Sequence, residues 1–310
     1  MGHTVKVALL FPGQGAQTPG MLHSLPDADD LVRAASDALQ EDILTLDTPV
    51  ALDSTRNVQL ALLVTETAWA RRLIDAGVRP DYLAGHSVGL WSAAVATGSV
   101  RFEDAVRLVA IRGAAMERGS LGGGMIAVDG LTAGQVDAAA ERLRATGAQV
   151  WASNVNAPTQ VTASGAASDL DALATALQEL GARRITRLAV PVAAHTPLMA
   201  GAAEAVRIGL VRISIADLRI PIAGNAAGRT IFTAKELAVD LVESMTHGVQ
   251  WATGTAILSE RGVDTWIEIP PGRSLVHLTS PDDHIVAVAD VGVEATVERL
   301  RAWRRTIERP

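Results

Sequence analysis

Short apolar runs alternate with longer amphipathic stretches along most of the chain. Residues 5–11 form an apolar run closed by a turn signal, which is the pattern of a buried strand. Apolar residues then recur at helical spacing over 54–76, and a second short apolar run at 82–84 precedes another helical stretch at 102–116. This alternation predicts an α/β fold in which helices cover both faces of a parallel sheet.

The middle of the chain has a different order of elements. The patterns predict, in turn, a strand at 125–128, a helix at 133–146, strands at 150–154 and 160–163, a helix at 167–180 and a strand at 185–190. This βαββαβ order is that of a ferredoxin-like unit. We therefore expect residues 123–190 to form a small ferredoxin-like domain, inserted into a large α/β domain that comprises 1–122 and 191–310. In the last part we expect helices from 197 and at 234–245, 251–260 and 293–305, with strands near 220–224, 265–269 and 285–289.

The composition excludes several classes of protein. Of the 310 residues, 48% are hydrophobic and 3% aromatic, which is enough for a large core built mainly from Ala, Val and Leu. A net charge of −7 argues against a nucleic-acid partner, and the absence of cysteine excludes disulfides and thiolate catalysis. No metal-ligand spacing occurs, so we expect no metal. Because no apolar stretch approaches about 20 residues, we expect no membrane span, and the lack of cysteine suits a cytoplasmic protein.

A Gly-x-Ser-x-Gly pattern lies between the strand at 82–84 and a helical stretch. Its residues are Gly85, His86, Ser87, Val88 and Gly89. In this context the pattern is typical of a nucleophile elbow, whose tight turn exposes the serine hydroxyl above the sheet. The helix that follows points N–H groups and its positive dipole end at the same place. The plain alternative is an ordinary tight turn, since the pattern often occurs by chance.

His195 has the best setting of the seven histidines for a base that activates the serine. It follows an apolar run at 188–194 and precedes Thr196 and Pro197, which are a cap and a first residue typical of a helix start. A strand-to-helix junction is where an α/β sheet presents its active site. A half-buried histidine with only a structural role is the alternative.

Arg112 lies in an otherwise apolar helical stretch at 108–116. An arginine in this position can extend its charge to solvent from the edge of the helix. It can also be a buried guanidinium that binds a carboxylate of the substrate. The glycine-rich loop at 13–20 lacks the spacing of a phosphate-binding or dinucleotide-binding loop, but its backbone amides could stabilise an oxyanion.

Several separated motifs resemble, in order, those of the malonyl-CoA:acyl carrier protein transacylase family. The matching residues are 11–17, 59–63, 85–89, 111–113, 190–195, 225, 249–251 and 268–272. The resemblance covers almost the whole chain, and an inserted ferredoxin-like domain belongs to that family's fold. It implies malonyl-CoA as the substrate, the phosphopantetheine-type arm of an acyl carrier protein as the acceptor, and no permanently bound cofactor.

The resemblance also implies a role for each matching residue. Ser87 would carry the acyl group as an ester, with His195 as its base and no carboxylate behind it. Arg112 would bind the free carboxylate of malonyl. The remaining roles are those of Gln14 and Val88 as an oxyanion hole through their backbone N–H groups, of Gln250 as the backbone partner that orients the histidine, and of Gln59, His86 and Asn225 as supporting polar groups.

Three features depart from the family pattern. Leu90 stands where many members have a glutamate, and Pro270 replaces the usual glycine. The third feature is the sequence TPGMLHSLP at 18–26, with which the glycine-rich loop continues. These details are most similar to the transacylase subunit of malonate decarboxylase, which loads malonyl onto that enzyme's own carrier subunit. A malonyl transacylase of fatty-acid or polyketide synthesis is the alternative.

Two other classes of protein fit the sequence less well. An α/β-hydrolase esterase would need an acid before its histidine, but Asp217 follows His195. A non-catalytic scaffold would not need Ser87, His195 and Arg112 together.

If the partner is an acidic carrier protein, a local basic patch must bind it, because this chain is itself acidic. The candidate clusters are Arg183, Arg184 and Arg187 on the insert, and Arg299, Arg301, Arg304 and Arg305 on the last helix.

Overall fold

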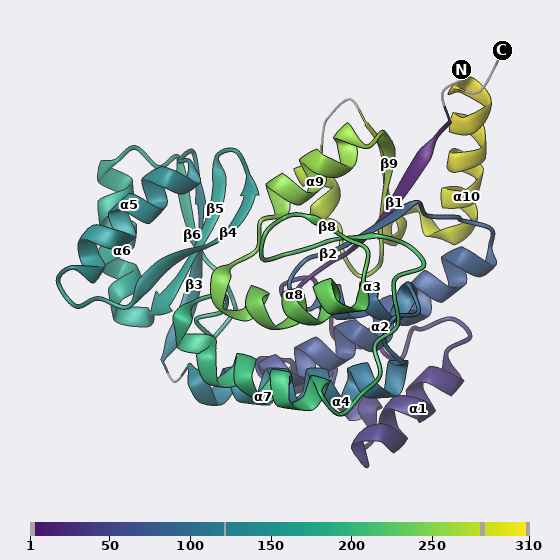
Figure 1. Ribbon diagram of the computed structural model, residues 1–310, viewed down its shortest axis with the longest axis horizontal. Coiled ribbons are helices and arrows are strands. Elements are labelled where there is room, and N and C mark those ends of the chain that lie inside the picture. The colour runs from purple at the N-terminus through teal and green to yellow at the C-terminus, as the bar shows by residue number, and fades with distance from the viewer. Residues whose placement is uncertain (1–3, 121, 280–282, 308–310) are drawn as a thin grey trace.

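The computed structural model describes residues 4–120, 122–279 and 283–307, which form two units with separate sheets (Figure 1). The larger sheet has the order β10 (His284–Ala287), β9 (Val263–Glu268), β1 (Lys6–Phe11), β2 (Tyr82–Gly85), β7 (Ile222–Ala223) and β8 (Thr230–Ile231). Its first five strands are parallel, and β8 is antiparallel to β7. The predicted α/β fold with a parallel sheet is therefore confirmed.

Both faces of the larger sheet are buried. Along β1, Leu9 and Phe11 enter one hydrophobic cluster and Ala8 and Leu10 another, because successive side chains of a strand point to opposite faces. The first cluster includes residues of α1 (Asp29–Leu39), α2 (Thr55–Asp75), α3 (Gly89–Ala96), α4 (Phe102–Gly119), α7 (Ala200–Leu210), α8 (Ala234–His247) and α10 (Val288–Ile307). The second includes residues of α9 (Trp251–Glu260) and the 3-10 helix η4 (Leu275–Leu278). None of the helices in the described part of the chain is long and apolar enough to cross a membrane.

The smaller unit lies to one side of the larger sheet (Figure 1). It consists of β3 (Gly123–Asp129), α5 (Ala133–Arg144), β4 (Val150–Ala157), β5 (Gln160–Ala166), α6 (Ala167–Glu179) and β6 (Arg184–Arg187). Its strands are antiparallel in the order β4-β5-β3-β6, and it has a hydrophobic cluster of its own. The order of elements along the chain agrees with the predicted βαββαβ pattern.

Some elements differ from the sequence-based prediction. Helix α1 was not expected, although its buried residues Leu31 and Ala35 are four positions apart, at helical spacing. Strand β6 ends at Arg187, so that residues 188–190 leave the sheet earlier than predicted. The helix expected from Pro197 begins as a 3-10 turn, η3 (Pro197–Met199), before α7. Two more 3-10 turns, η1 (Ile43–Thr45) and η2 (Ala51–Asp53), connect α1 to α2.

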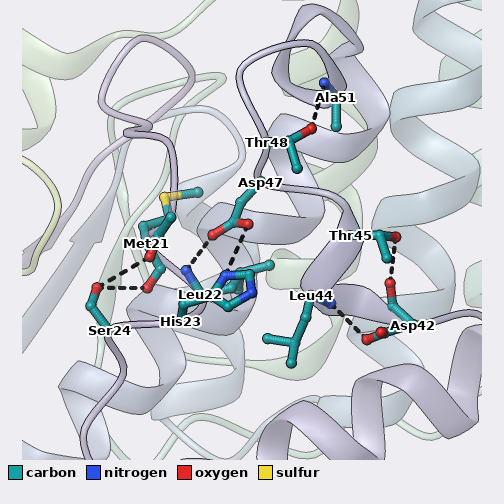
Figure 2. A network of polar contacts seen from close by, with 11 residues as sticks. Met21, Leu22, His23, Ser24, Asp42, Leu44, Thr45, Asp47, Thr48 and Ala51 are labelled. Atoms are coloured by element: carbon teal, nitrogen blue, oxygen red, sulfur yellow. Dashed lines mark hydrogen bonds and ion pairs between the residues drawn. The ribbon is translucent and has the colours of Figure 1, made fainter.

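The loop after β1 is fastened by a single buried carboxylate, as Figure 2 shows. Asp47 accepts a hydrogen bond from the N–H of Leu22 at 2.7 Å and forms an ion pair with Nδ1 of His23 at 3.3 Å. The backbone carbonyl of Asp47 also accepts a hydrogen bond from the N–H of Gly20 at 3.0 Å. Asp47 therefore fastens the middle of the segment 18–26 at Gly20, Leu22 and His23.

Candidate active site

A strained turn joins β2 to α3 and carries Ser87. The φ angle of Ser87 is 54°, in the left-handed region that non-glycine residues rarely adopt. A Cβ atom at Gly85 would lie 2.3 Å from the backbone of Gly89, and one at Gly89 would lie 2.3 Å from the carbonyl oxygen of Phe11. Only glycine fits at either position. The motif at 85–89 thus has the geometry of a nucleophile elbow.

His195 is hydrogen-bonded to the elbow serine. Its Nε2 lies 2.8 Å from Oγ of Ser87. Its Nδ1 donates to the backbone carbonyl of Ser244 in α8, so the lone pair of the neutral ring is on Nε2, facing the hydroxyl. The structure thus places side by side the two residues that the sequence singled out, and the partner of Nδ1 is a backbone carbonyl rather than an acidic side chain.

The orientation of the histidine differs from the prediction in one respect. Gln250 was expected to supply the carbonyl that orients His195, and that expectation is wrong because Ser244 supplies it. Gln250 immediately precedes α9, and its carbonyl accepts a hydrogen bond from Gly254 at 3.0 Å in the first turn. Its own N–H donates to the carbonyl of Asn225 at 2.7 Å. Gln250 therefore supports the surroundings of the elbow rather than the imidazole.

Burial keeps His195 in its neutral form. Desolvation, reinforced by the positive charge of Arg112 and by His86, lowers the pKa of His195 to about 3. The neutral imidazole is the form that accepts a proton from a hydroxyl group. At neutral pH the histidine is thus ready to act as a base, with no prior loss of a proton.

Arg112 places a buried positive charge next to the serine. It extends from α4, is only 2% exposed, and its Nη2 donates to Oγ of Ser87 at 3.2 Å. Its Nη1 has no hydrogen-bond partner, and none of the ion pairs among the described residues includes it. Burial lowers the pKa of Arg112 to about 10, which still leaves the guanidinium charged at neutral pH. A buried cation without a counter-ion is unfavourable, so this site is complementary to an anionic group of a substrate.

Two backbone N–H groups are free to stabilise negative charge near Ser87. Gln14 and Val88 both line the cavity that contains the serine, and within the described residues neither N–H has an acceptor. Val88 directly precedes α3, so the dipole of that helix adds to the positive potential there. Two such donors are the arrangement that an oxyanion hole requires.

The side chain of Asn225 forms two hydrogen bonds with the backbone of the elbow. Its Oδ1 accepts the N–H of Ser87 at 2.8 Å, and its Nδ2 donates to the carbonyl of Gly85 at 2.7 Å. The buried carboxylate of Asp240, in α8, accepts the N–H groups of Asn225 and Ala226 at 2.7 and 2.9 Å. These contacts stabilise the left-handed backbone of the serine, which costs about 1–3 kcal/mol on its own. Sequence reasoning identified Asn225 as a supporting residue and missed Asp240.

The dyad lies in a cavity of about 460 Å³ that is lined by both units. The smaller unit contributes Asn154, Asn156 and Gln160, and Ser274 and His277, at the start of and within η4, also line it. Sequence reasoning missed these five residues. Asn154 and Asn156 lie where the register of β4 with β5 shifts, so the alternation of a regular strand does not identify them.

Polar contacts fix the walls of this cavity. Nε2 of His86 lies 3.1 Å from Oδ1 of Asn156, which joins the elbow to the smaller unit. Gln59 contacts the sulfur of Met116 at 3.5 Å through Nε2, and its Oε1 has no partner. Both residues lie in the lining of the cavity, and the supporting role that the resemblance implies for them stays a prediction. No group of three or more histidine, aspartate or glutamate side chains in the described segments could hold a metal ion.

The geometry provides a serine next to a neutral base, two free N–H donors and a buried cation. This chemistry, at the carboxyl end of a parallel sheet, is that of enzymes that transfer acyl groups. Residues 8–300 match the acyl transferase domain family, so the chain belongs to that family and is an acyltransferase.

Curated relatives and solved structures extend this assignment. The malonyl CoA-acyl carrier protein transacylase of Bacillus subtilis is 32% identical over 302 residues, which cover 94% of this chain and 95% of that protein. The corresponding protein of Salmonella typhimurium is 34% identical over 282 residues, 88% of this chain and 91% of the relative. The structure of the malonyl CoA-acyl carrier protein transacylase from Coxiella burnetii matches with a TM-score of 0.90 and 28% identity, over 97% of this chain and 99% of that one. A malonyl-transacylase in complex with a type II polyketide acyl carrier protein matches with a TM-score of 0.87 and 32% identity. The match covers 94% of this chain and 98% of that one.

Proposed function

We propose that this acyltransferase moves malonyl groups from coenzyme A to the thiol of an acyl carrier protein. The observation that carries the proposal is the buried, unpaired guanidinium of Arg112 beside Oγ of Ser87. A malonyl group bound to this serine as an ester has a free carboxylate that can neutralise the guanidinium through two hydrogen bonds. The names of the similar proteins, which are malonyl transacylases, support the same conclusion.

The first half-reaction acylates the enzyme. Oγ of Ser87 attacks the thioester carbonyl of malonyl-CoA while Nε2 of His195 takes the hydroxyl proton. The tetrahedral oxyanion accepts hydrogen bonds from the N–H groups of Gln14 and Val88. When the carbon–sulfur bond breaks, the imidazolium returns the proton to the departing thiolate of coenzyme A. The products are malonyl-Ser87 and free coenzyme A.

The second half-reaction repeats these steps with a different nucleophile. The phosphopantetheine thiol of the carrier gives its proton to His195 and attacks the ester carbonyl of malonyl-Ser87. The oxyanion forms in the same place, and the collapse of the intermediate releases Oγ of Ser87, which recovers the proton from the imidazolium. A ping-pong sequence follows, because coenzyme A must leave before the carrier thiol can react.

Replacing Arg112 by alanine is expected to shift the donor preference from malonyl-CoA toward acetyl-CoA. The malonyl carboxylate then remains desolvated and unpaired, which costs a few kcal/mol or about 10²–10³-fold in kcat/KM, whereas the neutral acetyl group has little to lose. Steady-state rates with both donors measure the shift. Arg107→Ala on the same helix is the matched control, since Arg107 is exposed and pairs with Asp104. Equal losses for both donors would assign Arg112 a purely structural role.

For the carrier, we propose the carrier subunit of malonate decarboxylase. The supporting features are Leu90, Pro270 and the segment 18–26 that Asp47 fastens (Figure 2). A carrier of fatty-acid or polyketide synthesis is the second candidate, supported by the similarity to the complex with a polyketide carrier. The smaller unit, residues 123–190, we interpret as an inserted ferredoxin-like domain of this enzyme.

Parallel transfer assays distinguish the carriers. We expect faster transfer to the decarboxylase carrier than to fatty-acid or polyketide carriers, and a rate that falls as salt screens the contact. Of the two basic clusters, the one at Arg183, Arg184 and Arg187 lies by β6, next to Leu188 in the cavity wall, whereas α10 carries the other away from the smaller unit (Figure 1). Neutralising the first cluster should therefore slow transfer more. A preference for another carrier would remove the decarboxylase assignment and leave the transacylase intact.

A further inference from the structure

Two buried hydroxyl groups hold the backbone of Ala193, two residues before His195. Oγ of Ser120 accepts a hydrogen bond from the N–H of Ala193. Oγ1 of Thr196 donates a hydrogen bond to the carbonyl of Ala193 at 2.8 Å. Ser120 is only 6% exposed, and Ala193 and Thr196 are fully buried. Both backbone groups of Ala193 are therefore held by side chains, away from solvent.

Thr196 does not have the role that its position in the sequence suggests. A threonine before a helix that begins with proline is typical of a cap, whose side chain accepts an N–H group of the first turn. The side chain of Thr196 accepts no such hydrogen bond from η3, and its hydroxyl bonds backwards to Ala193 instead. The hydroxyl thus serves the segment that carries His195 rather than the helix that follows.

The turn that this hydrogen bond closes contains the strained backbone of His195. The φ angle of His195 is 62°, in a region that a non-glycine residue keeps only where the surrounding contacts over-determine it. The two hydroxyl groups supply such contacts at Ala193. The arrangement matches that at the elbow, where the side chain of Asn225 holds the strained backbone of Ser87.

Ser120 also links this turn to the helix that carries Arg112. It directly follows α4, about two helical turns after Arg112, and its carbonyl accepts the N–H of Gly123 at 2.9 Å. A Cβ atom at Gly123 would lie 2.1 Å from Oγ of Ser120 and 2.8 Å from the nitrogen of Ala193, so only glycine leaves room for their contact. The segments that carry the base and the cation therefore meet at one hydroxyl group.

We propose that Ser120 and Thr196 are positioning residues for His195 in acyl transfer. By fixing both backbone groups of Ala193, they keep Nε2 of the imidazole within hydrogen-bonding reach of Oγ of Ser87. Neither residue lines the cavity that contains Ser87, so each acts on the reaction only through the residues that it holds. The proposal rests on the proposed reaction at Ser87, but not on malonyl as the acyl group.

The burst of p-nitrophenolate that p-nitrophenyl acetate releases when it acylates the enzyme tests the proposal, with Ser87→Ala as the blank. This neutral ester has no carboxylate for the guanidinium to bind, so its rate reports the dyad alone. Thr196→Val, which keeps the shape of the side chain, and Ser120→Ala should each slow acylation about tenfold or more, because a small displacement of a base from its reaction geometry is costly. Thr196→Ser, which retains the hydroxyl, should acylate at close to the wild-type rate.

A second measurement repeats the two substitutions in the His195→Ala variant. There the hydroxyl groups have no imidazole to position, so neither Thr196→Val nor Ser120→Ala should slow the residual reaction further. Ser99→Ala is the matched control, since Ser99 is a buried serine whose hydroxyl has no hydrogen-bond partner in the described part of the chain, and its rate should be unchanged. Urea unfolding of each variant verifies that the rates belong to folded protein.

Losses as large in the His195→Ala background as in the wild type would overturn the proposal, because the two hydroxyl groups would then act on the fold and not through the imidazole. Unchanged rates in Thr196→Val and Ser120→Ala would overturn it as well. If malonyl-CoA failed to acylate the wild type, by contrast, the proposed donor would be wrong and this test would still hold.

Discussion

After brief exposure to malonyl-CoA, intact-protein mass spectrometry of the Ser87→Ala variant is expected to show no covalent adduct. The wild-type enzyme should gain one malonyl group, located on the peptide that contains Ser87. The reason is geometric, because the elbow presents one hydroxyl at 2.8 Å from Nε2 of His195, and alanine removes the only atom that can form the ester. The expected loss is complete rather than partial.

A serine on α3, the helix that follows the elbow, provides the control. Ser92 in α3 is fully buried, so Ser92→Ala removes a hydroxyl of the same kind without touching the dyad. This variant should acquire the malonyl group as the wild type does. An adduct that persists in Ser87→Ala and maps to another residue would show that the wrong nucleophile was chosen.

Replacing His195 by alanine is expected to lower the rate of acylation by about 10²–10⁴-fold, the usual contribution of a general base. Stopped-flow or quenched single-turnover measurements with malonyl-CoA give this rate directly. His247→Ala is the control, since His247 is an exposed histidine at the end of α8. Normal acylation in His195→Ala would contradict the assignment.

The same prediction has a dependence on pH. Burial and the nearby charge of Arg112 lower the pKa of His195 to about 3, so the neutral base is fully populated well below pH 6.5. The rate of acylation in the wild type should therefore remain level between about pH 7 and pH 5, whereas an ordinary histidine would lose activity through pH 6.5. The same shift in pKa makes the folded protein less stable at low pH. Below pH 6.5 the unfolded chain binds a proton at this residue that the folded chain does not, so its contribution to the free energy of unfolding falls as the pH drops toward 3.

The elbow and the dyad could be predicted because their signals are local. Gly85 is required within the turn itself, where a Cβ atom would lie 2.3 Å from the backbone of Gly89, and the junction of an apolar run with a helix start identifies the surroundings of His195. The need for glycine at position 89 comes from the neighbouring strand, since a Cβ atom there would lie 2.3 Å from the carbonyl oxygen of Phe11. Arg112 was identified as a lone charge in an apolar helix, although its distance from Ser87 depends on how α4 packs.

The partners of these residues could not be predicted, because they depend on tertiary packing. Every residue has a carbonyl group, so nothing in the sequence distinguishes Ser244 from Gln250 as the partner of Nδ1, and the approach of α8 decides it. Likewise, η4 forms a wall of the cavity because the buried carboxylate of Glu268 accepts the N–H groups of Ser274 and Val276 at 3.1 and 3.0 Å. Helix α1 is the exception, because Leu31, Ala35 and Leu39 recur at helical spacing and its periodicity was available in the sequence but was not used.

The backbone of the dyad has a consequence for how such an enzyme can change over generations. Ser87 and His195 both have positive φ angles, 54° and 62°, each of which costs a non-glycine residue about 1–3 kcal/mol. At the two positions where the chemistry occurs, the side chain that the reaction needs is therefore also a source of backbone strain. In a duplicated gene that is no longer selected for acyl transfer, glycine at either position removes activity and relieves this strain, against the loss of the packing and hydrogen bonds of the replaced side chain. Selection for acyl transfer, rather than for folding, is thus what retains a non-glycine residue with positive φ at these two positions.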